Sequence, residues 1–138
     1  MYVLDTCICA EFLRGRLPET FKSFKRSSPA MFKIPAIALA ELKFGVEISA
    51  KVDENRFETE LFVLPFEILP FDARCASEYA KIRAHLKRAG RTIGPNDLLI
   101  AATALAHDAT LVTLNDREFK RVPGLRVEYW DEINPAKA

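Results

Sequence analysis

Two observations predict an α/β fold with three layers, in which helices cover both faces of a mainly parallel sheet of four or five strands. Short apolar runs alternate with longer segments of helical spacing, and this alternation is typical of parallel sheets. The chain has 138 residues, of which 49% are hydrophobic and 28% charged, so it can bury a sizeable core. No internal repeat or linker divides it, and we expect residues 1–138 to form one domain.

The strands are predicted from five short apolar runs. They cover residues 2–4, 31–34, 66–69, 110–113 and 126–129. The first run ends directly at Asp5, as expected for a buried strand that is followed by a turn. We expect the last run to lie at an edge of the sheet.

Helical segments separate these runs. We expect helices over residues 8–14, 19–26, 35–49, 53–63, 72–88 and 97–107. Pro35 suits a first helical turn, Asp72 suits an N-cap, and Gly90 suits the end of a helix. The helix over residues 72–88 has an apolar stripe at helical spacing, formed by Cys75, Tyr79, Ile82 and Leu86.

Charge and cysteine content bear on partners and compartment. The formal net charge is +1, which by itself indicates no particular partner. Cys7, Cys9 and Cys75 are an odd number of cysteines, and no charged leader precedes an apolar run, so we expect a reducing, cytoplasmic compartment. The longest apolar stretch, residues 98–106, is too short to span a bilayer.

Four acidic residues occupy positions where a carboxylate is costly. Asp5 and Asp116 follow apolar strands, Asp97 opens an apolar helix, and Glu41 shares the apolar face of the helix over residues 35–49. A carboxylate beside a core is unfavourable unless it is paired or binds a metal ion. Ligands bind at the carboxyl ends of parallel strands, so we expect these acids to form one cation site.

Each acid also has a simpler explanation. Asp5 and Asp116 could be turn residues, Glu41 could lie at the rim of an apolar stripe, and Asp97 or Asn96 could be a helix N-cap. One shared site explains all four positions at once, whereas the simpler explanations require four separate coincidences. Mg²⁺ and Mn²⁺ prefer carboxylate oxygens, and either cation can activate water and stabilise charge at phosphorus. The acids therefore predict metal-dependent phosphodiester hydrolysis.

Five segments, in this order and spacing, carry a resemblance to a known family. They are VLDT (residues 3–6), AELKFG (40–45), GRTIGPNDLLIAA (90–102), LVTLNDREF (111–119) and VPGL (122–125). Together they resemble the PIN-domain ribonucleases, specifically the VapC-type toxins of bacterial toxin–antitoxin pairs. The resemblance covers nearly the whole chain and implies a PIN-like arrangement of the predicted three layers.

The resemblance also implies an activity and its partners. It implies a Mg²⁺- or Mn²⁺-dependent endoribonuclease that hydrolyses tRNA or another structured RNA. It implies a cognate VapB-type antitoxin that covers the acidic site, and a homodimer that can join a larger toxin–antitoxin complex. By position, Asp5, Glu41 and Asp97 match the family's main catalytic, metal-binding acids, and Asp116 or Asn115 fills the fourth place.

Neighbouring polar residues are expected to support these acids. We expect Thr6 to orient Asp5, and Thr113 and Asn115 to provide hydrogen bonds; Asn96 belongs to the same group. Where the family often has Asn or Ser, this chain has Cys7, which predicts the loss of one polar contact.

Two surface features remain to be assigned. The basic residues Lys87, Arg88 and Arg91 lead directly towards Asp97, and we expect them to contact RNA phosphates, although most such runs are only solvated helix faces. Phenylalanines are frequent in two segments and predict core packing or a groove for an antitoxin segment; they are Phe12, Phe21, Phe24, Phe57 and Phe62.

Other functions fit the sequence less well. An inhibitory RNA-binding module without turnover would use the same acids for a structural cation. A phosphate enzyme of the haloacid dehalogenase type would need a second Asp where Cys7 stands. Cys7 and Cys9 do not suggest a zinc site, because such sites normally need four ligands and positions two apart on a helix do not share a face.

Overall fold

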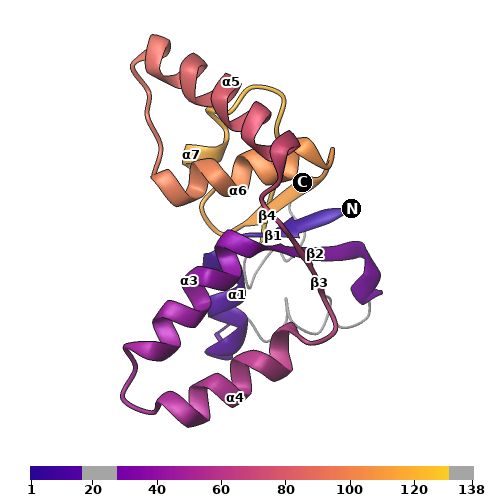
Figure 1. Ribbon diagram of the computed structural model, residues 1–138, viewed down its shortest axis with the longest axis vertical. Coiled ribbons are helices and arrows are strands. Elements are labelled where there is room, and N and C mark those ends of the chain that lie inside the picture. Colours follow the sequence, from indigo (N-terminus) through magenta and orange to yellow (C-terminus); the bar gives the residue numbers. More distant parts are fainter. Residues whose placement is uncertain (17–27, 131–138) are drawn as a thin grey trace.

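The computed structural model describes residues 1–16 and 28–130, and a five-stranded sheet runs through its centre (Figure 1). The strands are β1 (Tyr2–Leu4), β2 (Phe32–Pro35), β3 (Glu67–Leu69), β4 (Thr110–Thr113) and β5 (Arg126–Tyr129). Their order is β3-β2-β1-β4-β5, and every neighbouring pair is parallel. The predicted fold class is confirmed, and β5 lies at an edge as expected.

Helices fill the connections between the strands. They are α1 (Thr6–Leu13), α3 (Ala36–Glu47), α4 (Val52–Val63), α5 (Ala73–Ala89), α6 (Pro95–Ala106) and α7 (Asp116–Phe119), with a 3-10 turn at Pro29–Met31. Figure 1 shows α1, α3 and α4 on one side of the sheet and α5, α6 and α7 on the other, which gives the three predicted layers. The helix predicted over residues 19–26 lies outside the described residues.

Local sequence signals set several helix boundaries. The carboxylate of Asp72 accepts a hydrogen bond from the backbone N–H of Cys75 at 3.1 Å, so Asp72 is the predicted N-cap of α5. Gly90 ends α5 with a φ of 66°, a conformation that favours glycine. Pro35, expected inside a helix, is instead the last residue of β2 and precedes α3.

The core fills both faces of the sheet because helices cover the central strands on both sides. Val3 and Leu4 of β1 and Leu111 and Val112 of β4 have no exposed surface. Most of α6 is also buried, and its alanines allow α5 to pack closely against it. This packing places the start of α6 near the carboxyl ends of β1 and β4, where the candidate acids lie.

Within residues 1–16 and 28–130, each helix is too short or too polar to cross a bilayer.

Candidate functional site

Asp5 is the most deeply buried of the candidate acids. It follows β1 directly, and only 2% of its surface is exposed. One carboxylate oxygen accepts a hydrogen bond from the backbone N–H of Ile8 at 3.0 Å, which caps α1, and the hydroxyl of Thr113 donates to the other. Burial raises the pKa of Asp5, the nearby charge of Glu41 adds to this, and the hydrogen bonds oppose it. The strand-end prediction for Asp5 and the support by Thr113 are both confirmed.

Cys7 makes a polar contact with Asp5, although the sequence predicted that a cysteine at this position would lose one. Its Sγ lies 3.2 and 3.1 Å from the two carboxylate oxygens of Asp5, so the thiol donates to that carboxylate. Burial, with the charge of Asp5, raises the pKa of the Cys7 thiol to about 12. The thiol therefore stays protonated at neutral pH, and the prediction of a lost contact is wrong.

Glu41 is held by a residue that was expected to serve Asp5. The hydroxyl of Thr6, in the first turn of α1, donates to Oε1 of Glu41 at 2.5 Å. The face that Glu41 shares with Phe44 and Ile48 is not the core face, because these two side chains are 64% and 69% exposed. The core face of α3 consists of Ala38, Leu42 and Val46. Glu41 thus faces an open apolar groove rather than the protein interior.

Asp97 lies in the first turn of α6, next to an acid that the sequence interpretation overlooked. Its side chain is hydrogen-bonded to that of Glu118 in α7. Burial raises the pKa of Asp97 to about 7, with contributions from this hydrogen bond and from the charges of Asp5, Glu118 and Glu41. The structure therefore brings together Asp5, Glu41, Asp97 and Glu118.

The capping alternative for α6 is wrong. The N-cap is Gly94, and no side chain makes a capping hydrogen bond there. A Cβ atom on Gly94 would lie 3.6 Å from Oδ2 of Asp97, so this backbone runs close beside the carboxylate. Asn96 is exposed and lines the groove that reaches Glu41.

Asp116, expected at the fourth position, is engaged elsewhere. Its Oδ2 lies 2.6 Å from Nζ of Lys120, one turn along the chain. No apolar pattern in the sequence marks Glu118, because it lies in the single helical turn α7, between Asp116 and the buried Phe119. Asn115 contributes through its backbone N–H, which donates to the Thr113 hydroxyl at 3.0 Å.

The donor set fits a hard divalent cation. The four carboxylates offer only oxygen atoms, and the charges of Asp5, Glu41 and Glu118 all raise the pKa of Asp97. A divalent cation relieves such repulsion, and Mg²⁺ and Mn²⁺ prefer these ligands. Within residues 1–16 and 28–130, no three His, Cys, Asp or Glu side chains are already drawn around a common ion position.

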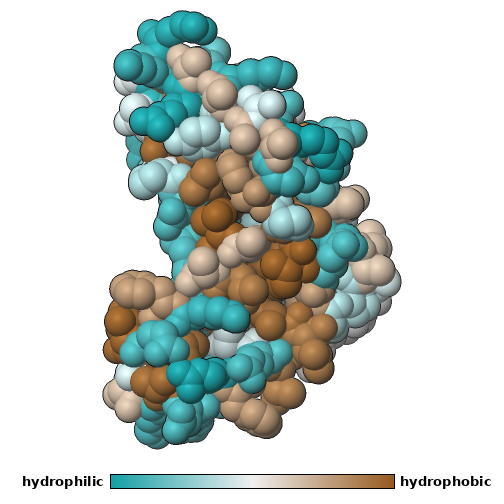
Figure 2. All heavy atoms as spheres, in the orientation of Figure 1, coloured by the Kyte–Doolittle hydropathy of each residue, from teal (hydrophilic) through white to brown (hydrophobic). Residues whose placement is uncertain are grey.

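A groove of about 870 Å³ leads away from the acids between α1, α3 and α4. Thr6, Glu41 and Asn96 lie along it, and the apolar part of its lining is formed by Ala10, Leu13, Ile37, Leu42, Phe44 and Val46. Figure 2 shows hydrophobic residues mixed with hydrophilic ones over α3 and α4, whereas α5 is covered mainly by hydrophilic residues. Of the phenylalanines expected to pack in the core or form a groove, Phe12 is buried, Phe62 is partly buried against the core, Phe57 is exposed, and Phe21 and Phe24 lie outside the described residues.

Comparisons with known proteins cover nearly the whole chain. The PIN domain family model matches residues 2–125. The chain is 39% identical to Ribonuclease VapC2 of Rickettsia felis, over 96% of this chain and 99% of that protein. It is 37% identical to the tRNA(fMet)-specific endonuclease VapC of Shigella flexneri, over 94% of this chain and 97% of that protein.

Solved structures of related proteins also match nearly the whole chain. The crystal structure of VapBC2 from Rickettsia felis, bound to a DNA fragment from their promoter, contains a chain with a TM-score of 0.89 and 39% identity. That match covers 94% of this chain and 98% of that one. The DNA-bound VapBC from Salmonella typhimurium gives a TM-score of 0.88 and 34% identity, over 93% of this chain and 96% of that one.

Proposed function

Because the chain belongs to the PIN-domain family and is a VapC-type ribonuclease toxin, we propose that Asp5, Glu41, Asp97 and Glu118 hold the divalent cation used to hydrolyse RNA. The observation that carries this proposal is the proximity of the other three carboxylates to Asp97, because their charges add to the effect of burial, which raises the pKa of Asp97 to about 7. Raised pKa values among neighbouring acids indicate negative charge that no protein group neutralises. When bound, Mg²⁺ or Mn²⁺ would supply an activated water and charge neutralisation at the scissile phosphate.

The protein groups prepare this site before a cation arrives. Asp5 is fixed by the N-terminus of α1, by Thr113 and by the thiol of Cys7, so its oxygens need little reorganisation. Because its pKa is raised to about 7, Asp97 carries a proton at lower pH, and this proton must leave when the carboxylate binds the cation. Proton release and cation binding are therefore coupled in this proposal.

Glu118 takes the fourth position in place of Asp116. The hydrogen bond between Glu118 and Asp97 supports this choice, and so does the ion pair that occupies Asp116. Asp116 then has the separate role of fixing Lys120 on the surface of α7.

The proposed substrate is a structured RNA, with tRNA as the leading candidate. One relative is named a tRNA(fMet)-specific endonuclease, which supports this class without specifying the tRNA. Lys87, Arg88 and Arg91 are exposed near the end of α5, and we assign them to RNA phosphates.

The groove between α1, α3 and α4 is the proposed seat of a VapB-type antitoxin segment. Several relatives were solved as VapBC complexes, which supports such a partner. The groove combines an apolar lining with an end at Glu41, so a segment bound there would also cover the acids. Homodimer formation and cytoplasmic location stay predictions; the free Cys7, Cys9 and Cys75 fit a reducing compartment.

The proposed reaction is tested by cleavage of total cellular RNA with the purified, antitoxin-free protein. Reactions contain EDTA, Mg²⁺ or Mn²⁺, with the Asp5→Asn variant alongside. Discrete products that require the cation and are lost in the variant would support the proposal. RNA that is bound but never cut, by folded protein with either cation, would instead favour an inhibitory RNA-binding module.

A further inference from the structure

Cations on one side of the acidic site are almost all neutralised. Around α1, α3 and α4, ion pairs join Arg14 and Arg16 to Glu11, Lys51 to Glu54, and Arg56 to Glu47 and Asp53. Lys33 on the neighbouring strand β2 is paired with Glu67 at 2.8 Å. Among the described residues of these elements, Lys43 alone is a cation without an ion pair.

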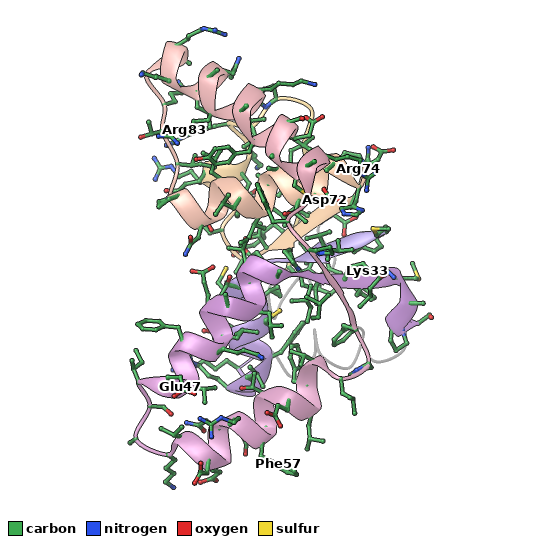
Figure 3. The ribbon with its side chains drawn as sticks, in the orientation of Figure 1. Lys33, Glu47, Phe57, Asp72, Arg74 and Arg83 are labelled. Carbon is green, nitrogen blue, oxygen red and sulfur yellow. The ribbon has the colours of Figure 1, made fainter. Side chains whose placement is uncertain are left out.

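On the other side, only some of the cations are paired: Arg74 with Asp72, Lys81 with Glu78 and Lys120 with Asp116. Near the α5–α6 connection and α7, five of them form no ion pair with any described residue: Lys87, Arg88, Arg91, Arg117 and Arg121. We call these five residues the cationic ridge. Arg83, which Figure 3 shows on the neighbouring part of α5, has no ion pair either and donates to the Tyr79 hydroxyl at 2.7 Å.

The cationic ridge is attached to the acidic site at two points. Arg117 is next in sequence to Glu118, which is hydrogen-bonded to Asp97. Arg121 donates through Nη1 to the backbone carbonyl of Thr92 at 3.2 Å, which ties the segment after α7 to the connection that leads into α6. The ridge is thus built from the segments that position Asp97 and Glu118.

We propose that the cationic ridge binds RNA phosphates on one flank of the scissile bond, and that Arg117 and Arg121 extend this surface across α7 to the cation site. The inference rests on the proposed nuclease function and adds its substrate-positioning surface. Several neighbouring arginines that form no ion pair with a described acid can each bind one phosphate of a polyanion such as RNA, because the phosphate then supplies the negative charge that the protein does not. Around α3 and α4, the described residues offer an acidic partner a single unpaired cation, Lys43.

Substitutions of Lys87 and Arg88 would be hard to interpret, because both residues also stabilise helix α5. Both lie in the last turn of α5, where basic side chains stabilise the helix dipole. Arg91 lies beyond the end of α5, and Arg117 lies on a single helical turn. Arg117 is also a basic residue in the last turn of its helix, but α7 has only four residues, so Arg91 and Arg117 affect helix stability less than Lys87 and Arg88 do.

The test is the salt dependence of RNA binding in EDTA, where no cleavage takes place. A fluorescein-labelled hairpin RNA is titrated by anisotropy with the wild type, Arg117→Ala, Arg91→Ala and the double variant. Each lost phosphate contact should reduce the slope of log K against log salt by about 0.9 for duplex, or about 0.7 for single-stranded RNA. Lys43→Ala is the matched control, since Lys43 is an exposed unpaired cation on α3, and its slope should equal that of the wild type.

The outcomes separate this inference from the proposed reaction. A double variant that melts at the wild-type temperature, binds Mn²⁺ as the wild type does and loses about 1.5 from the slope would support the ridge. The same variant with an unchanged slope, or a Lys43→Ala slope reduced equally, would overturn it. Failure of the wild type to cut any RNA with any cation would refute the nuclease proposal and leave the slope comparison standing.

Discussion

The two sides of the acidic site offer very different surfaces to a partner. On the side of α3 and α4, acids neutralise nearly every cation, and large apolar side chains are exposed; Phe57 projects from α4 in Figure 3. On the side of α5 and α7, apolar side chains are buried against α6, and the cations of the ridge have no acidic partners within the described residues. The same four carboxylates lie between an apolar groove and a cationic surface.

This difference indicates a division of labour between the two sides. A surface of paired charges and exposed apolar side chains gains stability when a protein segment covers it. A surface of unpaired cations is stabilised little by such a segment and strongly by a bound polyanion. Under the proposed function, the acids at the boundary would bind RNA from one side and be covered by an antitoxin from the other.

The largest effect on the cleavage rate is expected from Glu118, the acid that α7 contributes to the proposed cation site. Glu118→Gln removes a carboxylate from the cation site, and a loss of about 3 kcal/mol of stabilisation lowers the cleavage rate by about 100-fold. Asp116→Asn breaks only a surface ion pair with Lys120, worth at most about 1 kcal/mol, so its rate should stay within about fivefold.

Single-turnover cleavage of the same RNA by both variants at saturating Mn²⁺ measures this difference. The two variants change neighbouring acids of one short helix, so each controls for the other's effect on α7. A larger loss for Asp116→Asn than for Glu118→Gln would return the fourth position to Asp116.

The fourth position of the site shows where sequence patterns are weak. The alternation of strands and helices predicted the sheet, and its five runs agree with the five strands of the structure. Asp5, Glu41 and Asp97 were found because each interrupts an apolar pattern. Glu118 interrupts none, since its orientation depends on a single turn whose start the sequence did not define.

The contacts of Thr6 and Glu41 show a second limit. Apolar periodicity finds the face of a helix but does not say whether a neighbouring helix covers that face. The apolar face on which Glu41 was expected includes Phe44 and Ile48, and both are exposed; Phe44 lines the groove that α3 and α4 leave open. Thr6 faces Glu41 rather than Asp5 for a similar reason, since the packing of α1 on α3 is a tertiary property.

A smaller effect is expected on the groove side. Phe44 and Phe57 are 64% and 63% exposed, but only Phe44 lines the groove. Phe44→Ala should weaken binding of the cognate VapB-type antitoxin by about 30-fold, the effect of losing a buried aromatic contact of about 2 kcal/mol. Phe57→Ala should change the affinity by less than about threefold.

Isothermal titration of each variant with the antitoxin measures this difference. Because the two side chains match in type and exposure, unequal losses would locate the antitoxin in the groove. Equal losses, or a larger loss for Phe57→Ala, would move its binding surface to the outer face of α4. RNA binding in EDTA should be unchanged in both variants if the two sides of the site are independent.

The smallest effect concerns the proton on the α6–α7 side of the site. The pKa of Asp97 is raised to about 7, so below that pH the cation must displace a proton, and above it none remains. Affinity for Mn²⁺ should therefore rise by about tenfold per pH unit below pH 7 and level off above it. Titration calorimetry between about pH 5.5 and 8.5 measures this profile. Asp97→Asn should bind more weakly with a flatter profile; a wild type without pH dependence, or a variant that keeps the full slope, would place the proton elsewhere.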